Sequence, residues 1–191
     1  AFLLMLTSIA INVRPIFASD VHDVAVTEVT PSMNQVCQGL LVKVNVTVAN
    51  LGNVTEETFN VALYYDSTKI DEQPVENLTA EQTRTLSFSW NTSGVEPCKN
   101  YTLRANATIV LGDINETNNE LFGGPVKVNI FGDINGDGYV NIMDAVPIGV
   151  AFGSNPDDVL HWNPQADLNQ DEFINVKDII LLGQNFGAKH E

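Results

Sequence analysis

Between residues 20 and 130, apolar and polar residues alternate with a period of two, which is typical of strands with one buried face. The clearest run is 41–48, in which the side chains of Val42, Val44, Val46 and Val48 share one face. Because each apolar face must be buried against a second sheet, roughly seven such strands predict an all-β, immunoglobulin-like sandwich. The predicted strands begin near residue 24 and occupy about 41–48, 59–65, 69–75, 86–90, 101–109 and 126–130.

After residue 130 the apolar spacing changes from that of strands to that of helices. Residues 142–152 and 176–186 are apolar segments of helical length, and each ends before a glycine, Gly153 or Gly187. Pro147 lies inside the first segment, where the missing backbone donor predicts a kink. These two short helices predict a small α domain that follows the sandwich without a flexible linker.

A twelve-residue stretch just before the first helical segment has the spacing of a calcium loop. Oxygen-bearing side chains occupy its positions 1, 3, 5, 9 and 12, and Gly138 at position 6 permits the sharp turn that such a loop needs. A hard divalent cation prefers oxygen ligands, and position 7 supplies a backbone carbonyl. The expected ligands of this first loop are Asp133, Asn135, Asp137, Tyr139, Asn141 and Asp144.

The same pattern recurs at a constant offset of 34 residues, and it is again followed by an apolar helical segment. A single copy could be an Asp- and Asn-rich turn, but two copies in register favour two calcium ions. Glu172 occupies the place of Gly138, which predicts a more strained turn or a weaker site. The expected ligands of this second loop are Asp167, Asn169, Asp171, Phe173 (through its carbonyl), Asn175 and Asp178.

Both loops end in Asp rather than Glu, and a strand rather than a helix precedes the first loop. A tandem loop–helix pair of this kind resembles the dockerin domain. The resemblance covers residues 131–191 and implies a noncatalytic, calcium-dependent module that docks onto a cohesin-like protein. The residue pair after the ninth position is Ile142-Met143 in the first loop and Val176-Lys177 in the second. Cellulosomal dockerins often have hydroxyl residues there, so an apolar pair indicates another partner or an internal packing surface.

Residues 19–130 resemble the CARDB family of cell-adhesion-related domains from bacteria and archaea. The matching pieces are Asn50-x-Gly52, Phe59-x-Val61-x-Leu63-Tyr64-Tyr65-Asp66, Leu86-x-Phe88-x-Trp90-Asn91-Thr92 and Asn118-Asn119. The resemblance implies a β-sandwich that serves as a spacer or an adhesive surface.

The chain has two cysteines, Cys37 and Cys98, and no CxxC motif. Each precedes a predicted strand, and the two strands run in the same direction in opposite sheets. A Cys37–Cys98 disulfide at one end of the sandwich is therefore expected, with two free buried thiols as the alternative.

Seven N-x-S/T triplets all lie within the predicted sandwich, at Asn45, Asn53, Asn77, Asn91, Asn100, Asn106 and Asn115. They are glycosylation candidates, although Asn and Thr are also common on the solvated faces of strands. Residues 1–18 form an apolar run that ends in Ile16-Phe17-Ala18, which resembles a truncated signal peptide, with a buried helix or an anchor as alternatives. Together these features predict an extracellular or cell-surface protein.

The formal net charge of −15 argues against nucleic acid and anionic membranes as partners. The histidines are scattered, and no GxSxG, HExxH or P-loop motif is present, so an enzyme is not expected. The favoured function is a secreted, noncatalytic module that docks onto a protein partner. The alternative is the carbohydrate-binding accessory tail of a secreted hydrolase, which would take polysaccharide as its partner.

Overall fold

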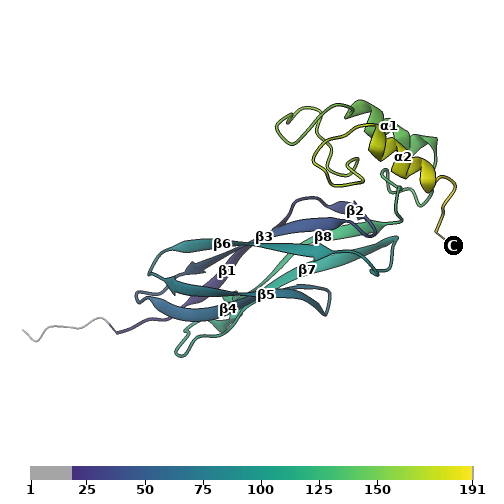
Figure 1. The fold of residues 1–191 in the computed structure, drawn as a ribbon. Helices are drawn as coiled ribbons and strands as arrows, with labels where there is room; N and C mark the ends of the chain where they lie inside the picture. Colours follow the sequence, from purple (N-terminus) through teal and green to yellow (C-terminus); the bar gives the residue numbers. More distant parts are fainter. Residues whose placement is uncertain (1–18, 191) are drawn as a thin grey trace, which may run out of the picture.

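A computed structural model describes residues 19–190, so the predicted signal segment, residues 1–18, lies outside the described residues (Figure 1). Eight strands form two sheets with the orders β1-β3-β6 and β2-β8-β7-β4-β5. The strands are β1 (Val24–Pro31), β2 (Gln35–Cys37), β3 (Leu41–Asn50), β4 (Glu56–Tyr65), β5 (Thr68–Leu78), β6 (Thr83–Asn91), β7 (Lys99–Ala107) and β8 (Glu120–Asn129). All named pairings are antiparallel except that of β2 with β8. The predicted β-sandwich is therefore confirmed.

The core between the two sheets follows the period-two pattern of the sequence. The four valines of β3 are completely buried, while Leu41, Lys43 and Asn45, which alternate with them, are exposed. Trp90 of β6 stacks on Tyr65 of β4 with ring centroids 5.0 Å apart, so this aromatic pair joins the two sheets. Burial of these apolar faces is the main force that holds the sheets together.

Several strand boundaries differ from the predicted ones, and β8, for example, begins at Glu120 rather than near residue 126. β7 ends at Ala107 rather than at Ile109, because the chain turns toward β4 at Thr108. The Thr108 hydroxyl accepts a hydrogen bond from the backbone N–H of Asn60 at 2.7 Å, and Ile109 is exposed to solvent. The three-residue strand β2 was not predicted, because so short a segment shows no alternation.

The C-terminal segment contains a 3₁₀ turn, η2 (Ile142–Asp144), and two helices, α1 (Ala145–Val150) and α2 (Val176–Gln184). Both helices are shorter than predicted. Pro147 is the third residue of α1, where the backbone N–H has no partner within the helix, so the proline does not kink it. A further 3₁₀ turn, η1 (Glu116–Asn118), precedes β8. None of the helices between residues 19 and 190 combines the length and apolar character needed to span a bilayer.

The predicted Cys37–Cys98 disulfide is not formed, and both cysteines are free in this structure. Cys37 lies in β2, where it pairs with Asn129 of β8, and the Cys98 N–H donates to Val128 O at 2.6 Å from the opposite side of β8. The intervening strand separates the two backbones by about two strand spacings, roughly 9–10 Å. That separation exceeds the reach of a disulfide, which needs Cα atoms within about 7 Å.

Candidate calcium loops and the cavity at the opposite end

The carboxylate of Asp133 is fully buried at the centre of the first loop (residues 133–144). Its Oδ1 accepts a hydrogen bond from the Asp137 N–H at 3.0 Å, and its Oδ2 accepts one from the Gly138 N–H at 2.9 Å. Gly138 has a left-handed backbone (φ +88°), as its position in the pattern predicts. The loop therefore folds around the carboxylate of its first residue.

Asp144 closes the first loop from the other side and is also fully buried. Its Oδ1 accepts from the backbone N–H groups of Ile134 and Asn135, at 2.8 and 3.1 Å. Its Oδ2 accepts from the Asn141 N–H at 2.8 Å, and the Asn141 side chain accepts from the Met143 N–H, which completes a capping box at the helical turn.

The remaining predicted ligands of the first loop form its outer rim. The side-chain oxygen of Asn135 accepts from the Asp137 N–H at 2.9 Å, and Asp137 Oδ1 accepts from the Tyr139 N–H at 2.9 Å. These are short turns in which a side-chain oxygen accepts from the backbone N–H two residues further along the chain. Tyr139 itself pairs with Lys189 in an isolated bridge, and its ring is exposed.

The second loop (residues 167–178) repeats this hydrogen-bond pattern at the same offset of 34 residues. Asp167 accepts from the N–H groups of Asp171 and Glu172, and Asp178 accepts from those of Leu168, Asn169 and Asn175. The rim of the loop repeats as well, with bonds from Asp171 N to Asn169 Oδ1, from Phe173 N to Asp171 Oδ1 and from Lys177 N to Asn175 Oδ1. Similar sequence spacing has therefore produced the same backbone fold twice.

The loops differ in strain and in charge. Gln170 and Glu172 adopt left-handed φ values of 54° and 61°, at positions where the first loop has Gly136 and Gly138. This geometry confirms the expected strain, because left-handed backbone is costly for residues with a Cβ. In addition, Lys177 Nζ lies 2.8 Å from Asp171 Oδ2, so an ammonium group already neutralises one carboxylate of the second loop.

Burial raises the pKa of the Asp133 carboxyl, with a further increase from the nearby charge of Asp144, while backbone N–H bonds oppose the shift. Burial likewise raises the pKa of Asp167, and the Asp178 charge adds to the effect. Each loop thus holds carboxylates whose charge is incompletely compensated.

Among the described residues, no three His, Cys, Asp or Glu side chains gather into a metal-binding group. The donor set of these loops is different in kind, because Asn amide oxygens and backbone carbonyls complement two buried carboxylates. All of these donors are oxygens, which is the chemistry that a hard divalent cation prefers. The residues therefore fit calcium by donor type and by burial.

Sequence reasoning missed the sandwich residues that hold the first loop from outside. Asn129 Nδ2 donates to Asp133 O at 3.1 Å, Gln35 Nε2 to Ile134 O at 2.9 Å, and Lys127 Nζ to Gly136 O at 2.5 Å. The three side chains come from β2 and β8, which pair with each other at the end of the sandwich nearest the helices (Figure 1). In the sequence, Lys127 and Asn129 are polar positions of a predicted strand, and Gln35 lies outside every predicted strand.

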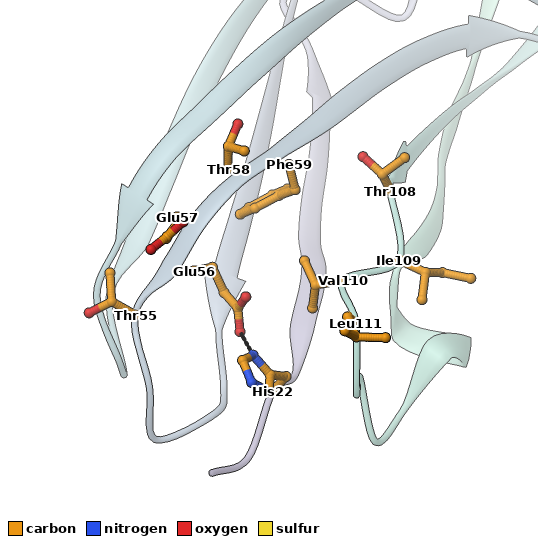
Figure 2. Close-up of a pocket in the computed structure, with 10 residues that line it drawn as sticks. All are labelled: His22, Thr55, Glu56, Glu57, Thr58, Phe59, Thr108, Ile109, Val110 and Leu111. Atoms are coloured by element: carbon orange, nitrogen blue, oxygen red, sulfur yellow. Dashed lines mark hydrogen bonds and ion pairs between the residues drawn. The ribbon is translucent and has the colours of Figure 1, made fainter.

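At the opposite end of the sandwich lies an open cavity of about 490 Å³ (Figure 2). The half-buried His22 places Nδ1 2.8 Å from Oε1 of Glu56, a carboxylate that is itself buried. Thr58 and Thr108 add hydroxyl groups, and Phe59 adds an apolar wall. Because the pair joins His22, two residues before β1, to the first residue of β4, it ties the N-terminal segment to the sheet.

The other residues singled out in the sequence are the seven sequon asparagines, Trp162, His161 and the loop 112–119. Six of the seven sequon asparagines are exposed, and Asn106 is half-buried. Trp162 is half-buried and packs against the hydrophobic core, as a packing residue would. His161 lies beside the carboxylate of Asp158 at 3.0 Å. In the loop 112–119, Asp113 accepts from Asn119 Nδ2 at 3.0 Å and from Asn115 N at 3.0 Å, which is the bonding of a polar turn.

Two packed sheets followed by a duplicated loop–helix segment define a β-sandwich protein with a C-terminal extension. Residues 22–122 match the family model of CARDB, which is more than half of the chain, and the chain belongs to this family. The matched range ends before the first loop, so the family assignment rests on the sandwich. No curated protein matches the chain.

Two solved structures are among those similar to this chain. The CARDB domain of a Pyrococcus furiosus protein, solved in complex with di-metal ions, is 24% identical with a TM-score of 0.50, and the match covers 60% of this chain and 99% of that chain. A domain of a Methanosarcina acetivorans protein described as a cell surface protein candidate is 28% identical, with a TM-score of 0.47 and coverage of 56% and 92%. The first of these likenesses supports the sandwich fold.

Proposed function

We propose that this chain is a noncatalytic module of the cell surface or the extracellular space, in which a CARDB sandwich carries a calcium-dependent, dockerin-like docking segment. The observation that carries the proposal is the duplicated cradle, in which two loops fold around buried carboxylates through the same hydrogen bonds. A chance turn would not recur at a fixed offset with the same partners.

The residues that would hold calcium are the side chains at positions 1, 3, 5, 9 and 12 of each loop, together with the carbonyls of Tyr139 and Phe173. When bound, the cation supplies the positive charge that two buried carboxylates in each loop otherwise lack. The chain itself positions those carboxylates through backbone N–H bonds, so loop folding and ion binding favour each other.

The docking surface in this proposal is the outer face of η2, α1 and α2. Ile142, Val146 and Val150 are 68%, 53% and 69% exposed, and Val176 and Ile180 of the second repeat are 57% and 53% exposed. Apolar side chains gathered on two short helices in this way are typical of a protein–protein contact. The partner is therefore a protein with an apolar recognition surface, such as a cohesin-like or cell-envelope protein.

The sandwich would serve as the spacer or the adhesive part of the module. Its exposed sequon asparagines can accept glycans without disturbing the core, which fits an extracellular surface. The His22–Glu56 pair joins two segments of the sandwich, which is a structural rather than a catalytic role.

A groove of about 320 Å³ favours the second candidate, a carbohydrate-binding tail. It runs between the sandwich and the second loop and is lined by Trp162, Met33, Ser89 and Lys43. An aromatic ring beside hydroxyl and charged groups is the chemistry of a sugar subsite. By contrast, the ring of Tyr64, an outward-facing aromatic of the sandwich, is covered by the Arg104 guanidinium at 4.3 Å.

Calcium calorimetry on the full chain tests the docking proposal. We expect two ions per chain, and no heat of binding after replacing both Asp133 and Asp167 with Ala. Pull-downs against cell-envelope proteins and against polysaccharides, with and without chelator, then separate the two candidates. The absence of calcium binding to the unmodified chain would refute the proposed function.

A further inference from the structure

The peptide groups of the first loop connect its carboxylate cradle to the sandwich. The peptide between Asp133 and Ile134 donates its N–H to Asp144, while its carbonyl accepts from Asn129 Nδ2. The next peptide donates the Asn135 N–H to Asp144, while the Ile134 carbonyl accepts from Gln35 Nε2. Each of these amides therefore bonds the cradle on one side and the sandwich on the other.

A third peptide has the same arrangement. The Asp137 N–H donates to Asp133 Oδ1, and the Gly136 carbonyl on the same peptide accepts from Lys127 Nζ. Hydrogen bonds arranged in series polarise one another, so a change at the carboxylate end alters the strength of the bond at the sandwich end. The cradle and the strand pair β2–β8 are thus linked through three hydrogen-bonded chains.

The fourth loop position is the point of closest approach. A Cβ added to Gly136 would lie 3.1 Å from Gln35 Oε1, 3.2 Å from Lys127 Nζ and 3.3 Å from Asn129 Nδ2. A side chain there would press against the three sandwich donors, and each of them would have to shift by a few tenths of an ångström. Glycine at the fourth position, with its left-handed φ of +74°, therefore allows the first loop to dock without displacing these donors.

The second loop docks through the same position by different chemistry. Gln170, its fourth residue, accepts from the Leu41 N–H at 2.9 Å and donates to the Leu41 carbonyl at 2.9 Å. These two bonds attach the loop to the first residue of β3 as a neighbouring strand would. Both loops therefore contact the sandwich through position 4, the first at β2 and β8 and the second at β3.

We propose that calcium loading is coupled to docking of the loops on the sandwich through position 4, so that calcium locks the two halves of the chain together. The proposal rests on the proposed function, because it requires the loops to take calcium. An ion that fixes the carboxylates fixes the three amides bonded to them, and these amides in turn hold Asn129, Gln35 and Lys127. Without the ion, repulsion between the like-charged carboxylates weakens the cradle, and the loop leaves the sandwich more often.

Cys37 provides a probe of this joint. It lies on β2 with 2% of its surface exposed, and its Sγ is 3.8 Å from the Asp133 carbonyl, so the first loop covers it. A maleimide can reach this thiol only when the loop moves away. The labelling rate of Cys37 in the full chain with Cys98→Ser therefore measures undocking.

We expect chelation with EDTA to speed the labelling of Cys37, measured by mass spectrometry, by about tenfold or more over the rate in calcium. Gly136→Ala should give fast labelling even in calcium. Its matched control is Gly187→Ala, because Gly187 has a similar left-handed φ (+88°) but nothing within 4 Å of the added Cβ. In the Gly187→Ala chain, Cys37 should be labelled slowly in calcium. Gln35→Ala, which removes one sandwich donor without backbone strain, should fall between the two.

Calorimetry on the same samples separates the two hypotheses. If calcium binds but Cys37 labels at the same rate in calcium and in EDTA, the coupling is refuted while the calcium module stands. Equal labelling of the Gly136→Ala and Gly187→Ala chains would refute position 4 as the docking point. If calcium does not bind at all, both the proposed function and the coupling are refuted.

Discussion

Replacing Asp144 separates the structural role of its carboxylate from its proposed role in metal binding. The Asp144 side chain accepts bonds from the N–H groups of Ile134, Asn135 and Asn141 while it is fully buried. The Ile134 N–H also donates a hydrogen bond to the Gly132 carbonyl at 3.1 Å, so it retains an acceptor after Asp144 is replaced. Asp144→Ala therefore leaves two backbone donors without an acceptor.

Each unsatisfied donor costs about 1–3 kcal/mol, so Asp144→Ala should lower the free energy of unfolding by about 2–6 kcal/mol in EDTA. Asp144→Asn keeps one acceptor oxygen for Asn135 but presents an amide to the Asn141 N–H, so it should cost about half as much. In calcium both variants should lose the additional stabilisation that the unmodified chain gains from the ion at the first loop.

Urea denaturation followed by circular dichroism, in EDTA and in calcium, measures both effects. Asp157→Ala is the matched control, because this exposed carboxylate lies outside both loops. A loss below about 1 kcal/mol for Asp144→Ala in EDTA would contradict the assigned hydrogen bonds. Two bound ions per chain in either variant would contradict the assignment of Asp144 as a ligand.

Three further predictions test the sandwich. Intact-mass analysis should find two free thiols, and a mass lower by two hydrogens would instead indicate the disulfide. Native alkylation should modify Cys98 well before Cys37, because burial raises the pKa of the Cys37 thiol to about 12. Gly52→Ala should severely destabilise the sandwich in a thermal melt, because its Cβ would lie 2.1 Å from a backbone carbonyl, whereas Gly124→Ala, with open space, should not. Trp90→Ala should cost about 3–5 kcal/mol in chemical denaturation, and a loss below about 1 kcal/mol would contradict its place in the core.

The sandwich was predictable because its strands are long and each has one buried face. In β3 the buried valines alternate with exposed or half-buried residues from Leu41 to Val48, so the period-two pattern is clear over most of the strand. Strand β2 has three residues and joins the sheet through a parallel pairing with β8, which follows it by about ninety residues. No local pattern encodes such a contact, because it depends on where the two segments meet in three dimensions.

The disulfide prediction failed for the same reason. It placed Cys37 at the start of a strand in the sheet opposite Cys98, whereas the chain forms β2 first and puts Cys37 in the same sheet. With β8 between the two cysteines, their proximity to the same end of the sandwich does not allow a bond. The prediction that both cysteines lie at one end of the sandwich was right, but the predicted order of the strands was wrong.

The loops were predictable at the level of the side chains that face inward. Position-specific Asp, Asn and Gly residues encode the turns around Asp133 and Asp167 locally, within twelve residues each. The donors that hold the first loop from outside, such as Gln35 and Lys127, come from distant strands and carry no spacing rule. Only the folded arrangement of the strands brings these donors to the loop.

The fourth residues of the two loops, Gly136 and Gln170, show that the number of glycines in a loop does not by itself decide how firmly the loop is held on the sandwich. Glycine in the first loop meets two requirements at once, a left-handed backbone and close contact with the sandwich. In the second loop, Gln170 adopts a left-handed conformation at a cost of about 1–3 kcal/mol. Its two hydrogen bonds to Leu41, worth about 0.5–1.5 kcal/mol each, offset much of that cost. Removing the side chain with Gln170→Gly would relieve the strain and lose the anchor, so the second loop is expected to bind calcium while its contact with β3 is released.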